Sequence, residues 1–209
     1  MSVTTATKTD SVVALAHQVA THPTTIVGSA IDCRTKMAVS IFLYHGYVEA
    51  AADTNPGEWL VQVRPDAGDG TDTENWVTIP AGVTAAGTTP DTEAMTATEP
   101  GGETVLAVAS TTGFAAKDEL YIQDTTTLED SEWATCRTFA SNASITLIDG
   151  LTTAKDSADV IWNDATKVVV ELDLKNVESF RVVWTHEGAT GANGHVKAIA
   201  TFHDSYTTT

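Results

Sequence analysis

Many separate segments of this chain alternate apolar and polar side chains with a period of two, and this pattern limits what it can fold into. The clearest example is residues 194–204, where every second residue from Val196 to Phe202 is apolar. Successive side chains of a β-strand point to opposite faces of the sheet. The apolar set is therefore expected to face inward, and the residues between them outward: His195, Lys197, Ile199, Thr201 and His203. The pattern predicts an all-β, antiparallel fold.

Further strands are predicted on both sides of a long loop. The loop, residues 80–102, is rich in Gly, Ala, Thr and Pro. A loop of this length within a compact domain indicates a domain boundary or a functional arm. Residues 36–49 are apolar on both faces, as expected of a central strand. The other predicted strands are 58–64, 75–79, 103–110, 118–124, 132–140, 144–149, 167–174 and 177–186.

The strand lengths and the charge predict a discontinuous domain organisation. Residues 23–92 plus 165–209 are expected to form an antiparallel β-sandwich, with residues 93–164 inserted as a small β-barrel domain and residues 1–22 forming a terminal helix or arm. The insert contains 13 acidic and 3 basic residues, a net charge of −10 that leaves −7 for the rest of the chain. Such a concentration of charge predicts that the insert faces solvent.

Residues 11–20 are the best candidate for a helix. Ser11 is a suitable cap, and Val12, Leu15 and Val19 fall at helical spacing. One short helix is marginal in water and needs a surface to pack on. That surface is either this chain's own β-domain or a neighbouring molecule. We expect residues 1–22 to cross to a neighbouring subunit or a capsid and to bury these three side chains there.

The charge of the chain excludes several classes of partner. The net charge is −17, with a pI near 4.4, and the 11 Lys and Arg are scattered singly. This field repels phosphate backbones, so no nucleic-acid partner is expected. The polar start lacks the features of a signal peptide, and no apolar run is long enough to span a bilayer. We expect a soluble protein made in the cytoplasm, without a membrane partner.

No catalytic constellation or cofactor motif emerges from the sequence. The two cysteines, Cys33 and Cys136, have no metal-binding spacing, and His195 and His203 would lie roughly 26 Å apart on one strand. We therefore expect no catalytic residue and no cofactor, and replacing His45, His186 and His203 by Ala should leave function intact. One loop could wrap Ca²⁺ through four carboxylates, but their spacing does not match an EF-hand loop, so a solvated hairpin loop is the favoured interpretation. Those residues are Asp66, Asp69, Asp72 and Glu74.

The middle of the chain resembles a module of structural proteins from tailed bacteriophages. The matching runs are TVLAVASTTGF, DELYIQD and EWATCRTFASNASITLIDGL, flanked by FLYHG at 42–46 and RVV at 181–183. Within the module, Gly113 and Asn142 suit tight turns, and Phe114 is expected to fill the barrel core. Lys117 departs from the pattern, which has Gly at that position.

The resemblance implies a non-enzymatic virion protein, of the kind that decorates or cements a capsid. Such a protein would bind the head surface of the virion as a homo-oligomer, with itself and the major capsid protein as partners. A tail or head–tail connector component is the alternative within the same class. A carbohydrate-binding adhesive β-sandwich is the alternative from another class, because exposed tryptophans could stack on sugars; in the core they could not. The residues concerned are Trp59, Trp76, Trp133 and Trp184.

Overall fold

The computed structural model describes residues 4–21, 24–47, 57–65, 76–83, 91–163, 165–186 and 193–208. These segments form antiparallel β-strands and one 3-10 turn, η1 (Leu128–Asp130), which confirms the all-β prediction. None of them forms a helix that is long and apolar enough to cross a membrane.

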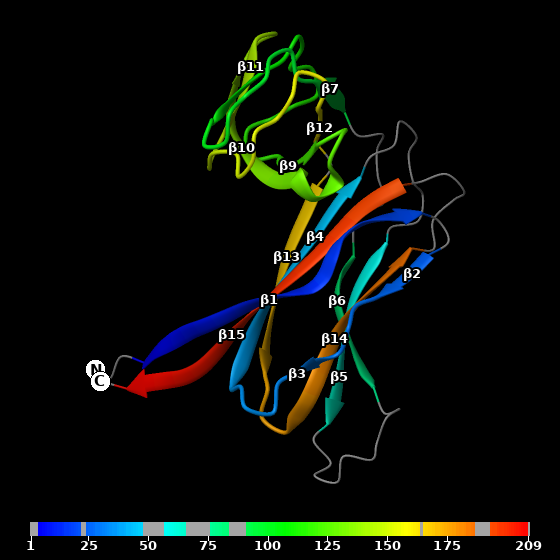
Figure 1. The fold of residues 1–209 in the computed structure, drawn as a ribbon, viewed down its shortest axis with the longest axis vertical. Helices are drawn as coiled ribbons and strands as arrows, with labels where there is room; N and C mark the ends of the chain where they lie inside the picture. Colours follow the sequence, from blue (N-terminus) through cyan, green and yellow to red (C-terminus); the bar gives the residue numbers. More distant parts are fainter. Residues whose placement is uncertain are drawn as a thin grey trace.

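Two sheets enclose the larger core of the molecule (Figure 1). The four-stranded sheet has the order β1 (Thr4–Thr21), β15 (Asn193–Thr208), β4 (Ala38–Tyr47) and β13 (Ala165–Asp173). The second sheet has the order β2 (Thr24–Val27), β14 (Val177–His186), β5 (Glu58–Pro65) and β6 (Val77–Val83), and β3 (Ile31–Asp32) also pairs with β14. The inward residues of both sheets are fully buried, among them Val39, Ile41, Leu43, Trp59, Val61, Phe180, Val182, Trp184, Val196 and Ala198.

A third sheet of six strands encloses a separate, smaller core. Its order is β7 (Thr92–Ala94), β12 (Val160–Trp162), β9 (Glu119–Gln123), β10 (Glu132–Ala140), β11 (Ser144–Leu147) and β8 (Val105–Ala107). A bridge between Met95 and Val108 joins the two outer strands, so the sheet closes on itself. All of these strands come from one continuous stretch, whereas the other two sheets use strands from before and after it. We call the six-stranded unit the barrel.

The barrel turns adopt the backbone conformations that the sequence suggested. Gly113 and Asn142 both have positive φ, at 84° and 53°. Phe114 is 5% exposed and lies in the barrel core. Lys117 also has positive φ, at 79°, and its amide donates a hydrogen bond to the Cys136 carbonyl at 2.7 Å. The left-handed conformation explains why glycine suits this position.

The prediction of a helix at residues 11–20 is wrong, because this stretch lies within β1 and pairs with β15. The register shifts between Lys8 and Ser11, between Val13 and Leu15, and between Leu15 and Gln18. Each shift places an extra residue on β1, so inward positions no longer alternate strictly. The shift between Val13 and Leu15 accounts for the spacing of three between the inward residues Val12 and Leu15, whereas Val19, the third residue of the suggested helical stripe, is exposed.

The strand predicted to end before Pro80 continues through it as β6. Pro80 lies opposite Leu60, next to a register shift in the pairing of β5 with β6. β6 is the edge strand of its sheet, and an edge strand tolerates the missing proline N–H. Of the predicted loop at 80–102, residues 80–83 therefore belong to β6 and residues 92–94 form β7.

Candidate functional site

The three residues expected to contact a neighbour lie in different environments on β1. Leu15 is 4% exposed and belongs to the core between the two sheets, and Val12 packs against that core. Leu15 is therefore buried within its own chain, which corrects its assignment to a neighbour. Val19 is 45% exposed. Its contact with a neighbour stays a prediction.

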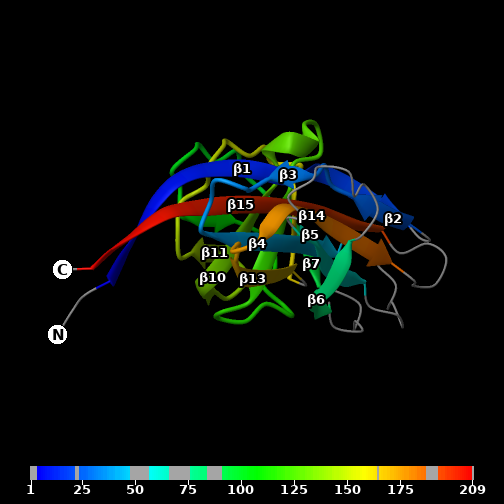
Figure 2. The same ribbon diagram turned by 90° about the horizontal axis from the view of Figure 1, so that it is seen from below.

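The two ends of the chain form a narrow β-ribbon that extends beyond the sandwich (Figures 1 and 2). Thr4–Thr7 pair with Ser205–Thr208, whereas the pairing of β4 with β15 ends at Ala38 and His203. We call these two paired segments the arm. Among the described strands, nothing pairs with either outer edge of the arm. Four residues of strand carry it ~13 Å past the sheet.

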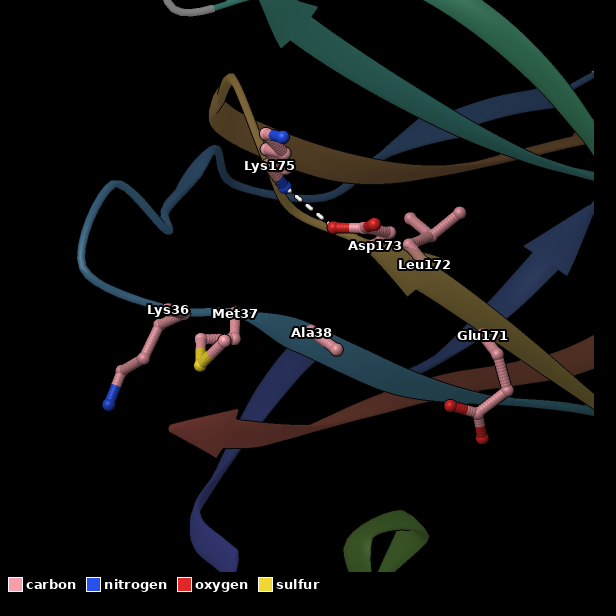
Figure 3. Close-up of a pocket in the computed structure, with 7 residues that line it drawn as sticks. All are labelled: Lys36, Met37, Ala38, Glu171, Leu172, Asp173 and Lys175. Carbon is pink, nitrogen blue, oxygen red and sulfur yellow. Dashed lines mark hydrogen bonds between the residues drawn. The ribbon is translucent and has the colours of Figure 1, made fainter. Parts of the chain in front are cut away.

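A groove of about 460 Å³ lies beside the base of the arm (Figure 3). Backbone hydrogen bonds of Met37 fix the chain segment that lines this groove. The Met37 amide donates to the His203 carbonyl at 3.2 Å. Figure 3 shows Glu171 pointing toward β15, with the two lysines at the far end of the group. Opposite charges thus balance within the groove. Its lining residues are Lys36, Met37, Ala38, Glu171, Leu172, Asp173 and Lys175.

Ser40, His203 and Glu171 form a polar group on the outer face of the four-stranded sheet. The Ser40 hydroxyl donates to Glu171 Oε2 at 2.9 Å and lies 2.8 Å from His203 Nε2. In a nucleophilic triad the carboxylate holds the imidazole, and the imidazole accepts the serine proton. Here the serine hydroxyl donates its hydrogen bond to the carboxylate and not to the imidazole. The geometry is that of a hydrogen-bonded link across three strands.

Aromatic and histidine rings join the barrel to the outer face of the same sheet. The Tyr121 ring of β9 packs against His17 and His195, and Trp133 of β10 packs against His17 and Tyr44. The Tyr121 hydroxyl lies 3.1 Å from His17 Nε2, which lies 3.3 Å from His195 Nδ1. We call these five residues the ring cluster. Beside it, Lys167 of β13 forms an ion pair of 2.6 Å with Glu119 of β9.

Burial keeps both histidines of the ring cluster neutral. Removal from water lowers the pKa of His17 to about 4, helped by the positive charge of Lys197 and opposed by the Leu128 carbonyl. Burial also lowers the pKa of His195 to about 4, with a smaller contribution from His17. In the neutral tautomer with Nε2 unprotonated, His17 can accept one hydrogen bond at this nitrogen, from the Tyr121 hydroxyl or from His195 Nδ1. Burial raises the pKa of Tyr121 as well, so its hydroxyl stays protonated.

The other residues considered from the sequence form no catalytic or metal-binding site among the described residues. His45 is buried and stacks on Trp184, with ring centroids 4.8 Å apart. Across the described segments, no group of three or more His, Cys, Asp or Glu is placed to hold a metal ion. The side chain of His186 and the proposed Ca²⁺ ligands lie outside the described residues, so the Ca²⁺ hypothesis stays a prediction. Those ligands are Asp66, Asp69, Asp72 and Glu74.

Two of the four tryptophans considered for sugar binding are in the core. Trp59 and Trp184 are 0% and 1% exposed and pack edge to face. Trp133 belongs to the ring cluster, and Trp76 lies under the Arg181 guanidinium, 4.3 Å from its ring centroid. Trp59 and Trp184 therefore cannot stack on a sugar, which corrects the alternative that relied on them.

The sequence predicted a terminal helix or arm at residues 1–22, but it did not predict the pairing of β1 with β15 or the ring cluster. The arm joins the two ends of the chain, and nothing in the alternation of either end indicates which strand it pairs with. For the cluster, no local signal was available, because neither His17 nor His195 has an aromatic neighbour in the sequence. Only the fold brings His17, Tyr121 and His195 together.

Comparison with known proteins gave only distant likenesses. No protein-family model matches the chain, and no curated protein does. Among solved structures, it is similar to the VP2 subviral particle of infectious bursal disease virus, with 10% identity and a TM-score of 0.24, over 95% of this chain and 41% of VP2. It is also similar to VP17, a capsid protein of bacteriophage P23-77, with 8% identity and a TM-score of 0.17, over 95% of this chain and all of VP17. The chain spans about two-fifths of VP2, and TM-scores this low carry no argument about function.

Proposed function

We propose that this chain is a non-enzymatic structural protein of a virus particle that works by associating with copies of itself. The observation that carries the proposal is the arm, a two-stranded ribbon with both outer edges free of other described strands. An isolated two-stranded ribbon is at best marginally stable in water. A ribbon that projects from its sheet therefore gains stability when a third strand pairs with it.

The sequence of the arm suits contact between copies of an acidic protein. Thr4–Thr7 and Ser205–Thr208 contain no charged residue, although the chain has a net charge of −17. Free strand edges are templates for pairing with another chain. An uncharged edge lets two acidic molecules meet without bringing their acidic surfaces together. We infer that the arm pairs with a sheet edge of a neighbouring copy.

The position of the protein in the particle is proposed from the resemblance to tailed-phage structural proteins. A capsid decoration or cement protein on the head surface fits a chain whose most acidic part, the barrel, is a separate lobe (Figure 1). In this arrangement the sandwich and arm contact neighbours and the major capsid protein, and the barrel points to solvent. A tail or head–tail connector component would make the same contacts at a different place in the virion.

Electron microscopy of virions purified from infected cells that produce this chain tests the proposal. Antibody raised against the barrel, residues 91–163, should label the outside of intact heads at regular positions. Label on tails alone would favour the tail or connector alternative. A chain absent from purified virions would contradict the proposed function.

A further inference from the structure

β15 has no described partner on one side along the arm. β4 pairs with β15 as far as Ala38 and His203, and the Met37 amide then donates to the His203 carbonyl. Beyond His203, no described strand pairs with this edge, whereas β1 pairs with the opposite edge as far as Thr208. A backbone edge of this kind is a template for a further strand. We call residues 204–208 of β15 the free edge.

The groove lies where the next two strands of the sheet stop. β4 begins at Ala38 and β13 ends at Asp173, and these two residues are paired. Both line the groove together with Met37, which is 46% exposed (Figure 3). A strand added to the free edge would continue the line of β4, and a second strand beside it would continue the line of β13. A two-stranded ribbon in this position would end at the groove.

The arm of a second copy has the form that this position requires. It is an antiparallel ribbon of two strands, and neither of its outer edges pairs with another described strand. Placed antiparallel to the first arm, it would add its own β15 to the free edge and its own β1 outside that. The strand order β1-β15-β4-β13 of the sheet would then pass into β1-β15-β15-β1 beyond His203. Because both copies make the same contacts, the arrangement closes as a two-fold dimer.

The free edge also determines the register of this pairing. Residues 204–208 pair with themselves along their full length only when the two-fold axis passes through Tyr206. Asp204 then lies opposite Thr208 of the second copy, and the two Asp204 residues are roughly 13 Å apart. Like charges directly opposite each other destabilise paired strands. This register avoids that repulsion, since residues 205–208 are uncharged.

The groove and the sheet around it are close to neutral, as contact with an uncharged arm requires. In the groove, Lys36 lies 3.6 Å from Asp10, and Asp173 accepts a hydrogen bond of 2.9 Å from the Lys175 amide. The four strands of the sheet have a net charge of −1, from lysines at 8, 167 and 197 and acidic residues at 10, 171, 173 and 204. A membrane surface or a nucleic acid would require a positive groove. A second copy of the arm requires only a groove that does not repel it.

We propose that the arms of two copies pair edge to edge through β15, about a two-fold axis at Tyr206, and that the tip of each arm lies in the groove of the other copy. The inference rests on the proposed function and names the edge, the register and the partner that self-association uses. Each ribbon becomes part of a four-stranded sheet, which is more stable than two strands alone. Five paired residues per copy form a small interface, so a single dimer is expected to be weak.

Disulfide trapping tests the edge and the register. Tyr206→Cys should form a covalent dimer on mild oxidation, because directly paired residues lie about 5 Å apart, within the span of a disulfide. The matched control is Ala6→Cys, since Ala6 pairs with Tyr206 in the same arm but belongs to the outer strand. The two copies of Ala6 would be three strand spacings apart, roughly 14 Å, which is too far for a disulfide. The native Cys33 and Cys136 are buried, at 1% and 0% exposure.

Substitution in the groove tests its contact with the arm of the second copy. Met37→Glu places a negative charge where that arm ends, and in sedimentation velocity it should raise the dissociation constant of the dimer by roughly tenfold. The matched control, Val77→Glu, places the same charge at a valine that is 54% exposed on the other sheet. The control should associate as the unmodified chain does, and circular dichroism should show that all of these variants are folded.

Two results would overturn this arrangement. A dimer trapped by A6C and not by Y206C would show that the arms pair through β1 and not through the free edge of β15. Association that M37E leaves unchanged, with no trapped Y206C dimer, would show that the copies associate by another contact. Labelling of intact virions tests the proposed function separately, because it does not depend on how the arms pair.

Discussion

At the residue scale, His17 and His195 make the junction of barrel and sandwich sensitive to pH. Their pKa values in the folded chain are about 4, below the value of 6.5 for an exposed histidine. The unfolded chain therefore binds these protons first as the pH falls. Their contribution to stability is complete above pH 6.5 and is lost progressively as the pH falls toward 4.

We predict that the free energy of unfolding drops between pH 7 and pH 5 partly because of these two histidines. The loss should be on the order of 2 kcal/mol for the pair, a figure that allows for the partial exposure of His17. Urea denaturation at several pH values would measure it, with H17Q/H195Q as the comparison. If the unmodified chain and the double variant lose stability in parallel over this range, the histidines do not control it.

Lys117 is a second residue at which we predict that a substitution changes the free energy of unfolding. Its φ of 79° costs an ordinary side chain on the order of 1–2 kcal/mol, and glycine avoids this cost. Lys117→Gly should therefore raise the free energy of unfolding by about 0.5–1 kcal/mol, after allowance for the greater freedom of glycine in the unfolded chain. Lys117→Ala removes the same exposed side chain but keeps the strain, so its stability should not rise. A destabilised glycine variant in urea denaturation would contradict the explanation.

At the element scale, regular alternation made most strands predictable, and bulges made β1 unpredictable. β15 follows the expected pattern, with Val196 to Phe202 buried on alternate positions. In β1, Ala14 and Leu15 are both buried because a register shift lies beside them. No single-sequence pattern reveals such a shift, since it depends on the partner strand. The pairing of β1 with β15 in the arm escaped prediction for the same reason, because it depends on the register between distant strands.

The barrel is the element that we predict to fold alone. Its core is separate from that of the sandwich, and its first and last strands pair at Thr92 and Trp162. Directly paired residues lie about 5 Å apart, so a short linker can replace the insert. Residues 91–163 should unfold cooperatively when expressed alone, as followed by circular dichroism during heating. The remaining chain, closed by a Gly-Ser bridge, should also fold, and failure of both pieces would show that 93–164 is not an independent domain.

At the scale of the whole molecule, charge is distributed so that one part of the surface can meet another copy. Residues 93–164 carry −10, whereas the four-stranded sheet, which includes the arm, carries −1. Contacts made through the neutral part keep the acidic lobes apart. This distribution, together with the free edges of the arm, is the basis for proposing a structural protein that assembles.

The solution mass of the full chain and of a chain limited to residues 9–203 tests this account most directly. The shorter chain lacks the arm but keeps the pairing of β4 with β15 as far as His203. Light scattering coupled to size-exclusion chromatography should find a concentration-dependent oligomer of the 22.0 kDa chain. The truncated chain should be folded but should associate more weakly than the full chain, because it lacks the arm. A full chain that remains monomeric at every concentration would contradict assembly through copies of itself.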